Sequence, residues 1–71
     1  MSTDERKKEL GKRIRQEREA QSISLRRFAT MIGLGHSYLV DVENGRRNIG
    51  FDNLCKIADG LGVSIGTLTD K

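Results

Sequence analysis

The sequence predicts an all-α protein, a compact bundle of five short helices. The chain has 71 residues and no proline, and apolar residues recur three or four positions apart along most of it, as they do on one face of a helix. Serine and glycine residues, which favour helix starts and helix ends, separate the apolar segments. Short connections between such segments are typical of a bundle rather than a coiled coil. We expect a single domain over residues 1–71.

The first predicted helix starts near Thr3, because Ser2 and Glu5 have the spacing of a capping box. Leu10 and Ile14 lie four positions apart, and Arg18 continues the same face. The other positions carry interspersed acidic and basic residues, which is the pattern of a solvated helix face. We therefore expect a long, charged helix that ends near residue 20.

Two short helices joined by a glycine turn are predicted next. Ser24 is the expected N-cap of the first, and Gly33 ends it after about two turns. The second begins at Gly35 or His36 and ends at residues 44–45. The apolar positions of this segment are Leu25, Phe28, Ala29, Ile32, Leu39 and Val42. This arrangement is that of a helix-turn-helix, in which a small residue and a turn glycine let the two helices cross closely.

The last part of the chain predicts two more helices. Residues 51–61 place apolar side chains on one face, and Gly62 ends this helix. Ser64 then caps a short final helix in which Ile65 and Leu68 point inward. This final helix depends on packing, because it also contains poor helix formers.

The charge is mildly basic and unevenly distributed. The formal net charge is +3 and the isoelectric point is near 9.4. Arginines give residues 25–50 a positive balance, whereas residues 51–71 are slightly acidic. This distribution is compatible with a polyanionic partner that contacts the middle of the chain.

Several other classes of function are not expected. A single histidine and a single cysteine offer no base and nucleophile pair, and Cys55 with His36 gives too few ligands for a structural zinc ion. We expect Cys55 to be a small core residue in a reducing compartment. No apolar run is long enough for a signal peptide or a membrane span. The sequence thus predicts a cytoplasmic protein that is not an enzyme and has no metal, cofactor, small-molecule ligand or membrane partner.

A series of short motifs runs in order from residue 10 to residue 68. They are Leu10-Gly11-x-x-Ile14-Arg15-x-x-Arg18, Ile23-Ser24, Phe28-Ala29-x-x-x-Gly33-Leu34, Ser37-Tyr38-Leu39, Val42-Glu43-Asn44-Gly45-Arg46-Arg47-Asn48 and Leu54-x-x-Ile57-Ala58-x-x-Leu61-Gly62-Val63-Ser64. In order and spacing these motifs resemble the lambda-repressor-like helix-turn-helix family, of the Cro/repressor or XRE type. The resemblance implies sequence-specific binding to double-stranded DNA, with the helix of residues 35–44 in the major groove.

The resemblance also implies roles for individual residues. The residues at its base-reading positions are His36, Ser37, Val40 and Asp41. Those implied to contact phosphates are Arg46, Arg47 and Asn48 in the loop after the recognition helix, Arg26 and Arg27 in the first turn of the preceding helix, and Tyr38 through its hydroxyl. Five alternatives remain open. Tyr38 packs at the helix edge, Arg26 and Arg27 face solvent, and Asp41 only excludes wrong sequences. His36 is a surface imidazole without a role, and residues 46–48 form a loop that only aids solubility. The pair Arg18 and Glu43 is implied to be structural.

A lone helix-turn-helix reads only a few base pairs, so we expect a homodimer on a palindromic operator. The apolar surface of residues 51–68 is the predicted interface, with Phe51, Ile65 and Leu68 contributing. Such a protein would regulate transcription as small phage repressors or restriction–modification controllers do. The alternative is an antitoxin-like or anti-repressor module that uses the same fold to bind a protein rather than DNA.

Overall fold

The computed structural model of the protein describes residues 2–70 and contains five helices in that range. They are α1 (Thr3–Ala20), α2 (Leu25–Ile32), α3 (His36–Glu43), α4 (Phe51–Leu61) and α5 (Ile65–Thr69). No strand is present between residues 2 and 70, so the predicted all-α, five-helix architecture is confirmed. The two end residues of the predicted 1–71 domain lie outside the described part. Among the helices described, none is long and apolar enough to span a membrane.

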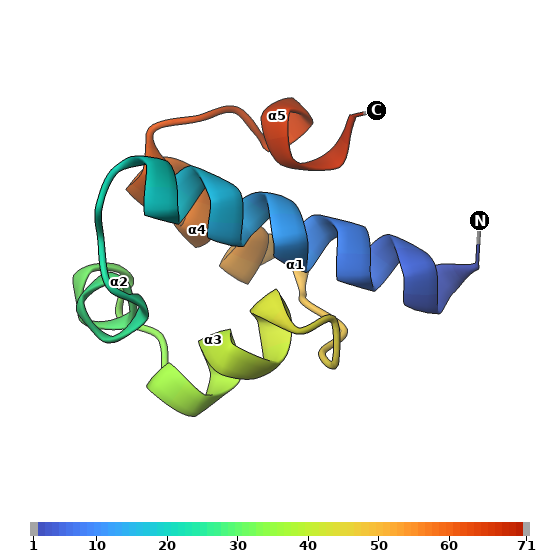
Figure 1. The fold of residues 1–71 in the computed structure, drawn as a ribbon, viewed down its shortest axis with the longest axis horizontal. Coiled ribbons are helices and arrows are strands. Elements are labelled where there is room, and N and C mark those ends of the chain that lie inside the picture. Colours follow the sequence, from blue (N-terminus) through green and yellow to red (C-terminus); the bar gives the residue numbers. More distant parts are fainter. Residues whose placement is uncertain (1, 71) are drawn as a thin grey trace.

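The long helix α1 crosses the whole molecule, and the other four helices surround it (Figure 1). It packs against α3, α4 and α5, while α2 packs against α3 and α4. One core lies between them, and every helix contributes to it. The buried apolar residues are Ile14, Phe28, Ala29, Leu39, Val42, Ile57, Ala58, Leu61 and Leu68. Their helical spacing predicts an apolar or inward position for each of them.

Three serine side chains begin helices as predicted. Ser2 and Glu5 form a complete capping box at the start of α1, with the Glu5 backbone N–H donating to Ser2 Oγ over 3.1 Å. Ser24 Oγ accepts the backbone N–H of Arg27 at the start of α2, and Ser64 caps α5 in the same way. Each of these bonds satisfies a backbone donor that has no partner within its own helix.

Leu68 corrects one prediction about the surface of the bundle. Its side chain is 1% exposed and belongs to the core. A residue that is already surrounded by its own chain cannot contact a second protomer, so its assignment to a dimer interface was wrong. Ile65 is half-buried against the same core, and Phe51 remains 68% exposed.

The helices α1 and α3 approach each other closely at Gly11, which is buried. A methyl group on Gly11 would overlap the backbone carbonyl oxygen of Val42 and would lie 2.6 Å from that of Glu43. Backbone oxygens at the end of a packed helix cannot move aside as a flexible side chain can. Glycine is therefore required at this position for α3 to lie where it does.

We predict that Gly11→Ala destabilises the fold by roughly 1–3 kcal/mol, the usual cost of overpacking a tight contact. Urea unfolding measures this difference. Gly50→Ser is the control, because a side chain on Gly50 meets nothing within 4 Å and its extended backbone suits the N-cap of α4. It should leave stability unchanged or raise it by less than about 1 kcal/mol. Equal stabilities for Gly11→Ala and the wild type would contradict the close approach.

Candidate nucleic-acid interface

A glycine turn sets the angle between α2 and α3. Gly33 adopts a left-handed conformation with φ of 72°, and the backbone N–H of Leu34 donates to the carbonyl of Ala29 over 3.1 Å. The chain reverses here, and Ala29 is 3% exposed on the inner side of the helix pair. Gly35 follows as the N-cap of α3 and makes no side-chain capping bond. The start of α3 is thus held by the turn rather than by a capping side chain.

The two sides of α3 differ in burial. Leu39 and Val42 lie in the core, with exposures of 0% and 3%. The four positions predicted to read bases are His36, Ser37, Val40 and Asp41, and none of them is buried. Ser37 is exposed and the other three are half-buried. The structure therefore leaves these four side chains on an uncovered part of α3, where their contact with bases stays a prediction.

The loop after α3 places two arginines next to that helix. Arg46 is 70% exposed, and its Nη1 lies 4.0 Å from Asp41 Oδ1. The guanidinium carbon of Arg47 lies 4.9 Å from the centre of the Tyr38 ring, a distance that permits a cation–π interaction. Asn48 is exposed in the same loop. Arg46 and Arg47 therefore lie on the side of the molecule that carries Asp41 and Tyr38.

Tyr38 combines packing with a surface hydroxyl. It is half-buried and packs against the core. Its Oη accepts a hydrogen bond from Nδ2 of Asn53, at 3.1 Å. Asn53 belongs to α4, and sequence reasoning did not identify it, because nothing in its own helical pattern points to a partner on α3. A phosphate contact by Tyr38 stays a prediction.

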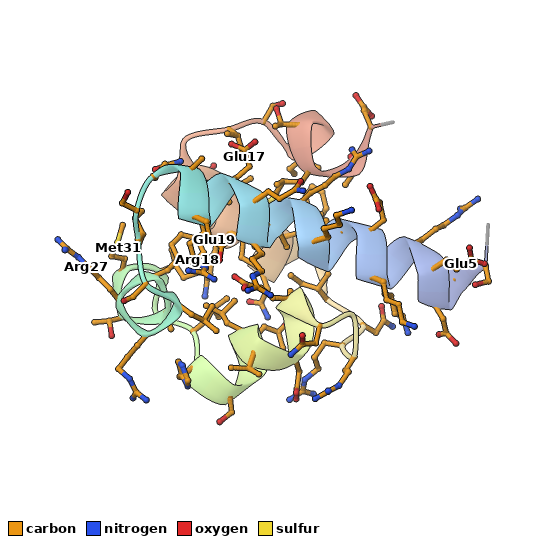
Figure 2. The ribbon with its side chains drawn as sticks, in the orientation of Figure 1. Glu5, Glu17, Arg18, Glu19, Arg27 and Met31 are labelled. Atoms are coloured by element: carbon orange, nitrogen blue, oxygen red, sulfur yellow. The ribbon has the colours of Figure 1, made fainter. Side chains whose placement is uncertain are left out.

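The arginines of α2 lie apart from this loop. Arg26 and Arg27 are both exposed in the first turn of the helix. Figure 2 shows Arg27 extending from α2 away from α3, on the same side as Met31. Because α2 adjoins the start of α3 and the arginine loop follows the end of α3 (Figure 1), the two groups of arginines lie at opposite ends of α3.

Arg18 and Glu43 form the only buried ion pair among residues 2–70. Nε and Nη2 of Arg18 donate to the two carboxylate oxygens of Glu43 over 2.8 and 3.0 Å, and Nη1 donates to the backbone carbonyl of Ile23 over 2.7 Å. The two side chains are 9% and 6% exposed. The hydrogen bonds with Glu43 raise the pKa of Arg18 despite its burial, so the guanidinium stays charged. The structure thus joins the pair that the sequence predicted, and the pair ties the end of α3 to α1.

These features define a helix-turn-helix protein: a glycine turn, a second helix with an uncovered polar side and a basic loop after it. The sequence model of the helix-turn-helix family matches residues 14–68, and the chain belongs to this family, of the Cro/repressor or XRE type. It is a DNA-binding regulator of transcription and not an enzyme.

Comparison with individual proteins finds restriction–modification control proteins and other transcriptional regulators. The chain is 39% identical over 51 residues to the control protein C.MunI of a Mycoplasma species, covering 72% of this chain and 69% of the relative. It is 38% identical over 61 residues to the control protein C.BamHI of Bacillus amyloliquefaciens, covering 84% and 75%. The crystal structure of the restriction–modification controller C.AhdI of Aeromonas hydrophila superposes with a TM-score of 0.83 at 34% identity, covering 86% and 92%.

We predict that Arg18→Leu lowers the free energy of unfolding by about 3–5 kcal/mol, because it leaves the Glu43 carboxylate buried without a partner. Because the pKa of Arg18 is raised, its guanidinium is charged at neutral pH, and the contribution of that charge is lost as pH rises into strong alkali. Urea unfolding near pH 7 is the measurement.

The exposed pair Arg15 and Glu19 supplies the matched control. Its N–O distance is 3.2 Å, but the two side chains are 59% and 54% exposed. Arg15→Leu should change stability by less than about 1 kcal/mol. If Arg18→Leu and Arg15→Leu lowered the free energy of unfolding by similar amounts, burial of the Arg18–Glu43 pair would not explain its contribution to stability.

Proposed function

We propose that this protein is a homodimeric controller that binds a palindromic operator through α3 and regulates restriction–modification genes. One observation carries the proposal: the uncovered part of α3 is bordered by a loop with two exposed arginines. A helix in the major groove needs side chains that reach base edges and, beside it, cations that hold the phosphate backbone.

The four uncovered side chains of α3 have the chemistry that base reading requires. His36 and Ser37 can donate to or accept from base edges, and Val40 can pack against a thymine methyl group. Asp41 can accept a hydrogen bond from a cytosine amino group. The 4.0 Å approach of Arg46 supports this role, because a nearby cation offsets the repulsion between a carboxylate and the phosphates.

The arginines supply the part of the affinity that does not depend on sequence. Arg46 and Arg47, with Asn48, would hold the phosphates beside the end of α3, and Arg26 and Arg27 would hold others beside α2. Guanidinium groups suit this task because they can donate two parallel hydrogen bonds to one phosphate. Each phosphate contact releases counterions, so binding should weaken steeply as salt concentration rises.

Phe51 supports a dimer. It is one of two large apolar side chains that stay well exposed between residues 2 and 70, the other being Met31 at 54%. Half-buried Ile65 is the second residue that we assign to this interface. A two-fold dimer would place two copies of α3 about 34 Å apart, one turn of DNA. The predicted cytoplasmic location belongs to this proposal.

The relatives C.MunI, C.BamHI and C.AhdI support the choice of controller over phage repressor, since their names describe control proteins or a restriction–modification controller. Footprinting of the purified protein across the genome that encodes it tests this choice. A controller should protect a palindromic site upstream of a restriction endonuclease or methyltransferase gene. Protection confined to other genes would contradict it.

We predict that alanine at both Arg46 and Arg47 weakens binding to every duplex. The slope of log affinity against log salt should fall by about one unit for each lost phosphate contact. Fluorescence anisotropy with a random-sequence duplex and with a selected operator measures both effects. The affinity for each duplex should fall by a similar factor, because phosphates carry no base identity.

Two variants control this experiment. Ser37→Ala should change the preference among operator sequences and leave the salt slope unchanged. Lys56→Ala removes an exposed cation of α4 that is not among the proposed DNA contacts, and it should change neither quantity. Wild-type salt dependence in the double arginine variant would contradict the proposed orientation on DNA. A wild-type protein with no steep salt dependence on any duplex would favour the protein-interaction module instead.

We predict that Phe51→Glu weakens self-association at least tenfold, because it places a charge in an apolar contact. Met31→Glu is the matched control, since it makes the same change at the other exposed apolar residue and should leave association unchanged. Sedimentation equilibrium gives both dissociation constants. Equal effects of the two substitutions, or a wild-type protein that stays monomeric on its operator, would contradict the proposed interface.

A further inference from the structure

Three parts of the chain meet at Tyr38. The tyrosine lies on α3, the amide that donates to its hydroxyl comes from Asn53 on α4, and the guanidinium over its ring comes from Arg47 in the loop between them. The donor–acceptor distance is 3.1 Å, and the guanidinium lies 4.9 Å from the ring centre. Arg47 itself is exposed. One aromatic side chain thus links α3, α4 and the loop at the surface.

The hydrogen bond from Asn53 fixes the direction of the tyrosine hydroxyl. A phenolic oxygen can accept and donate at the same time. When Asn53 Nδ2 donates to Oη, it occupies a lone pair and leaves the hydroxyl hydrogen to point elsewhere. Tyr38 and Asn53 are both half-buried. The bond between them fixes the tyrosine hydroxyl relative to α4 and so orients it.

We infer that Asn53 is a positioning residue for a phosphate-binding site formed by Tyr38 and Arg47. Asn53 holds the hydroxyl so that its hydrogen is offered to a phosphodiester oxygen of the DNA backbone, and the tyrosine ring holds the Arg47 guanidinium beside it. A neutral donor and a cation then bind one phosphate together. This inference rests on the proposed function, because the phosphate belongs to the operator.

The chemistry of the three groups suits a phosphate. Hydroxyl and guanidinium groups are both donors, and the oxygens of a phosphodiester are acceptors. Stacking on an aromatic ring reduces the number of orientations that the long arginine side chain must lose on binding. Asn53 therefore increases affinity for any duplex and leaves the choice of sequence to the uncovered side of α3.

A double-mutant cycle tests the inference. Tyr38→Phe keeps the ring and removes the hydroxyl, and it should lower affinity for a random-sequence duplex roughly tenfold. Asn53→Leu keeps a similar volume and removes the donor, and in the wild-type background it should lower affinity roughly threefold. In the Tyr38→Phe background the same change should have no further effect, because the group that Asn53 orients is gone. Anisotropy titrations of the full chain measure all four proteins.

The matched control is a second pair of substitutions whose effects on binding affinity should be independent. Asn53→Leu combined with Arg26→Ala should give the product of the two separate losses, since Arg26 lies on α2 and does not contact Tyr38. Unfolding and sedimentation of each variant separate this effect from lost stability or lost dimer, because Asn53 lies one turn or less from Phe51.

The outcomes are distinguishable. A loss from Asn53→Leu that is equal in both backgrounds, or that follows dimer dissociation, overturns the positioning role while the protein still binds DNA. A wild-type protein that binds no duplex overturns the proposed function itself. The inference is supported if Asn53→Leu lowers the affinity for DNA in the wild-type protein and has no further effect in the Tyr38→Phe variant.

Discussion

The packing of α1 against the C-terminal end of α3 is the contact on which the rest of the structure depends. Gly11 lets α1 approach the last carbonyl groups of α3, and Arg18 holds Glu43 with two hydrogen bonds. The opposite end of α3 is held to α2 by the turn at Gly33. Both ends of this eight-residue helix are therefore fixed. The apolar side of α3, with Leu39 at its centre, is packed into the core. The polar side of the same helix is therefore fixed at the surface.

The Arg18–Glu43 pair orients the segments that it joins more than it adds to the net free energy of folding. Apolar residues of similar volume can often replace a buried ion pair without loss of stability. Arg18, however, also donates to the carbonyl of Ile23, so one guanidinium joins α1, the α1–α2 connection and α3. Hydrogen bonds at fixed angles orient these three segments, which apolar contact alone does not do. A recognition helix that is already oriented loses less conformational entropy when it binds.

Local pattern predicted most of the fold, and contacts between distant residues account for what it missed. Apolar spacing with capping serines and turn glycines gave five helices and the uncovered side of α3, because these signals act within one turn of the chain. The same spacing could not show which apolar residues are buried in the core and which stay exposed. Leu68 is buried, whereas Phe51 is exposed. It also missed the role of Gly11 and the hydrogen bonds of Gln21 and Asn53, whose partners lie 40 and 15 positions away.

In the proposed dimer, the position of α4 would connect association with DNA affinity. Phe51 and Asn53 lie in its first turn, so a partner packed against Phe51 would also hold the backbone that carries Asn53. Asn53 in turn donates a hydrogen bond to the hydroxyl of Tyr38, and the guanidinium of Arg47 lies over the Tyr38 ring. Association would then strengthen the phosphate contacts of each protomer in addition to doubling their number. Under this arrangement, operator occupancy would rise more steeply with protein concentration than it would for two independent half-site binders. The regulator would then respond to its own abundance.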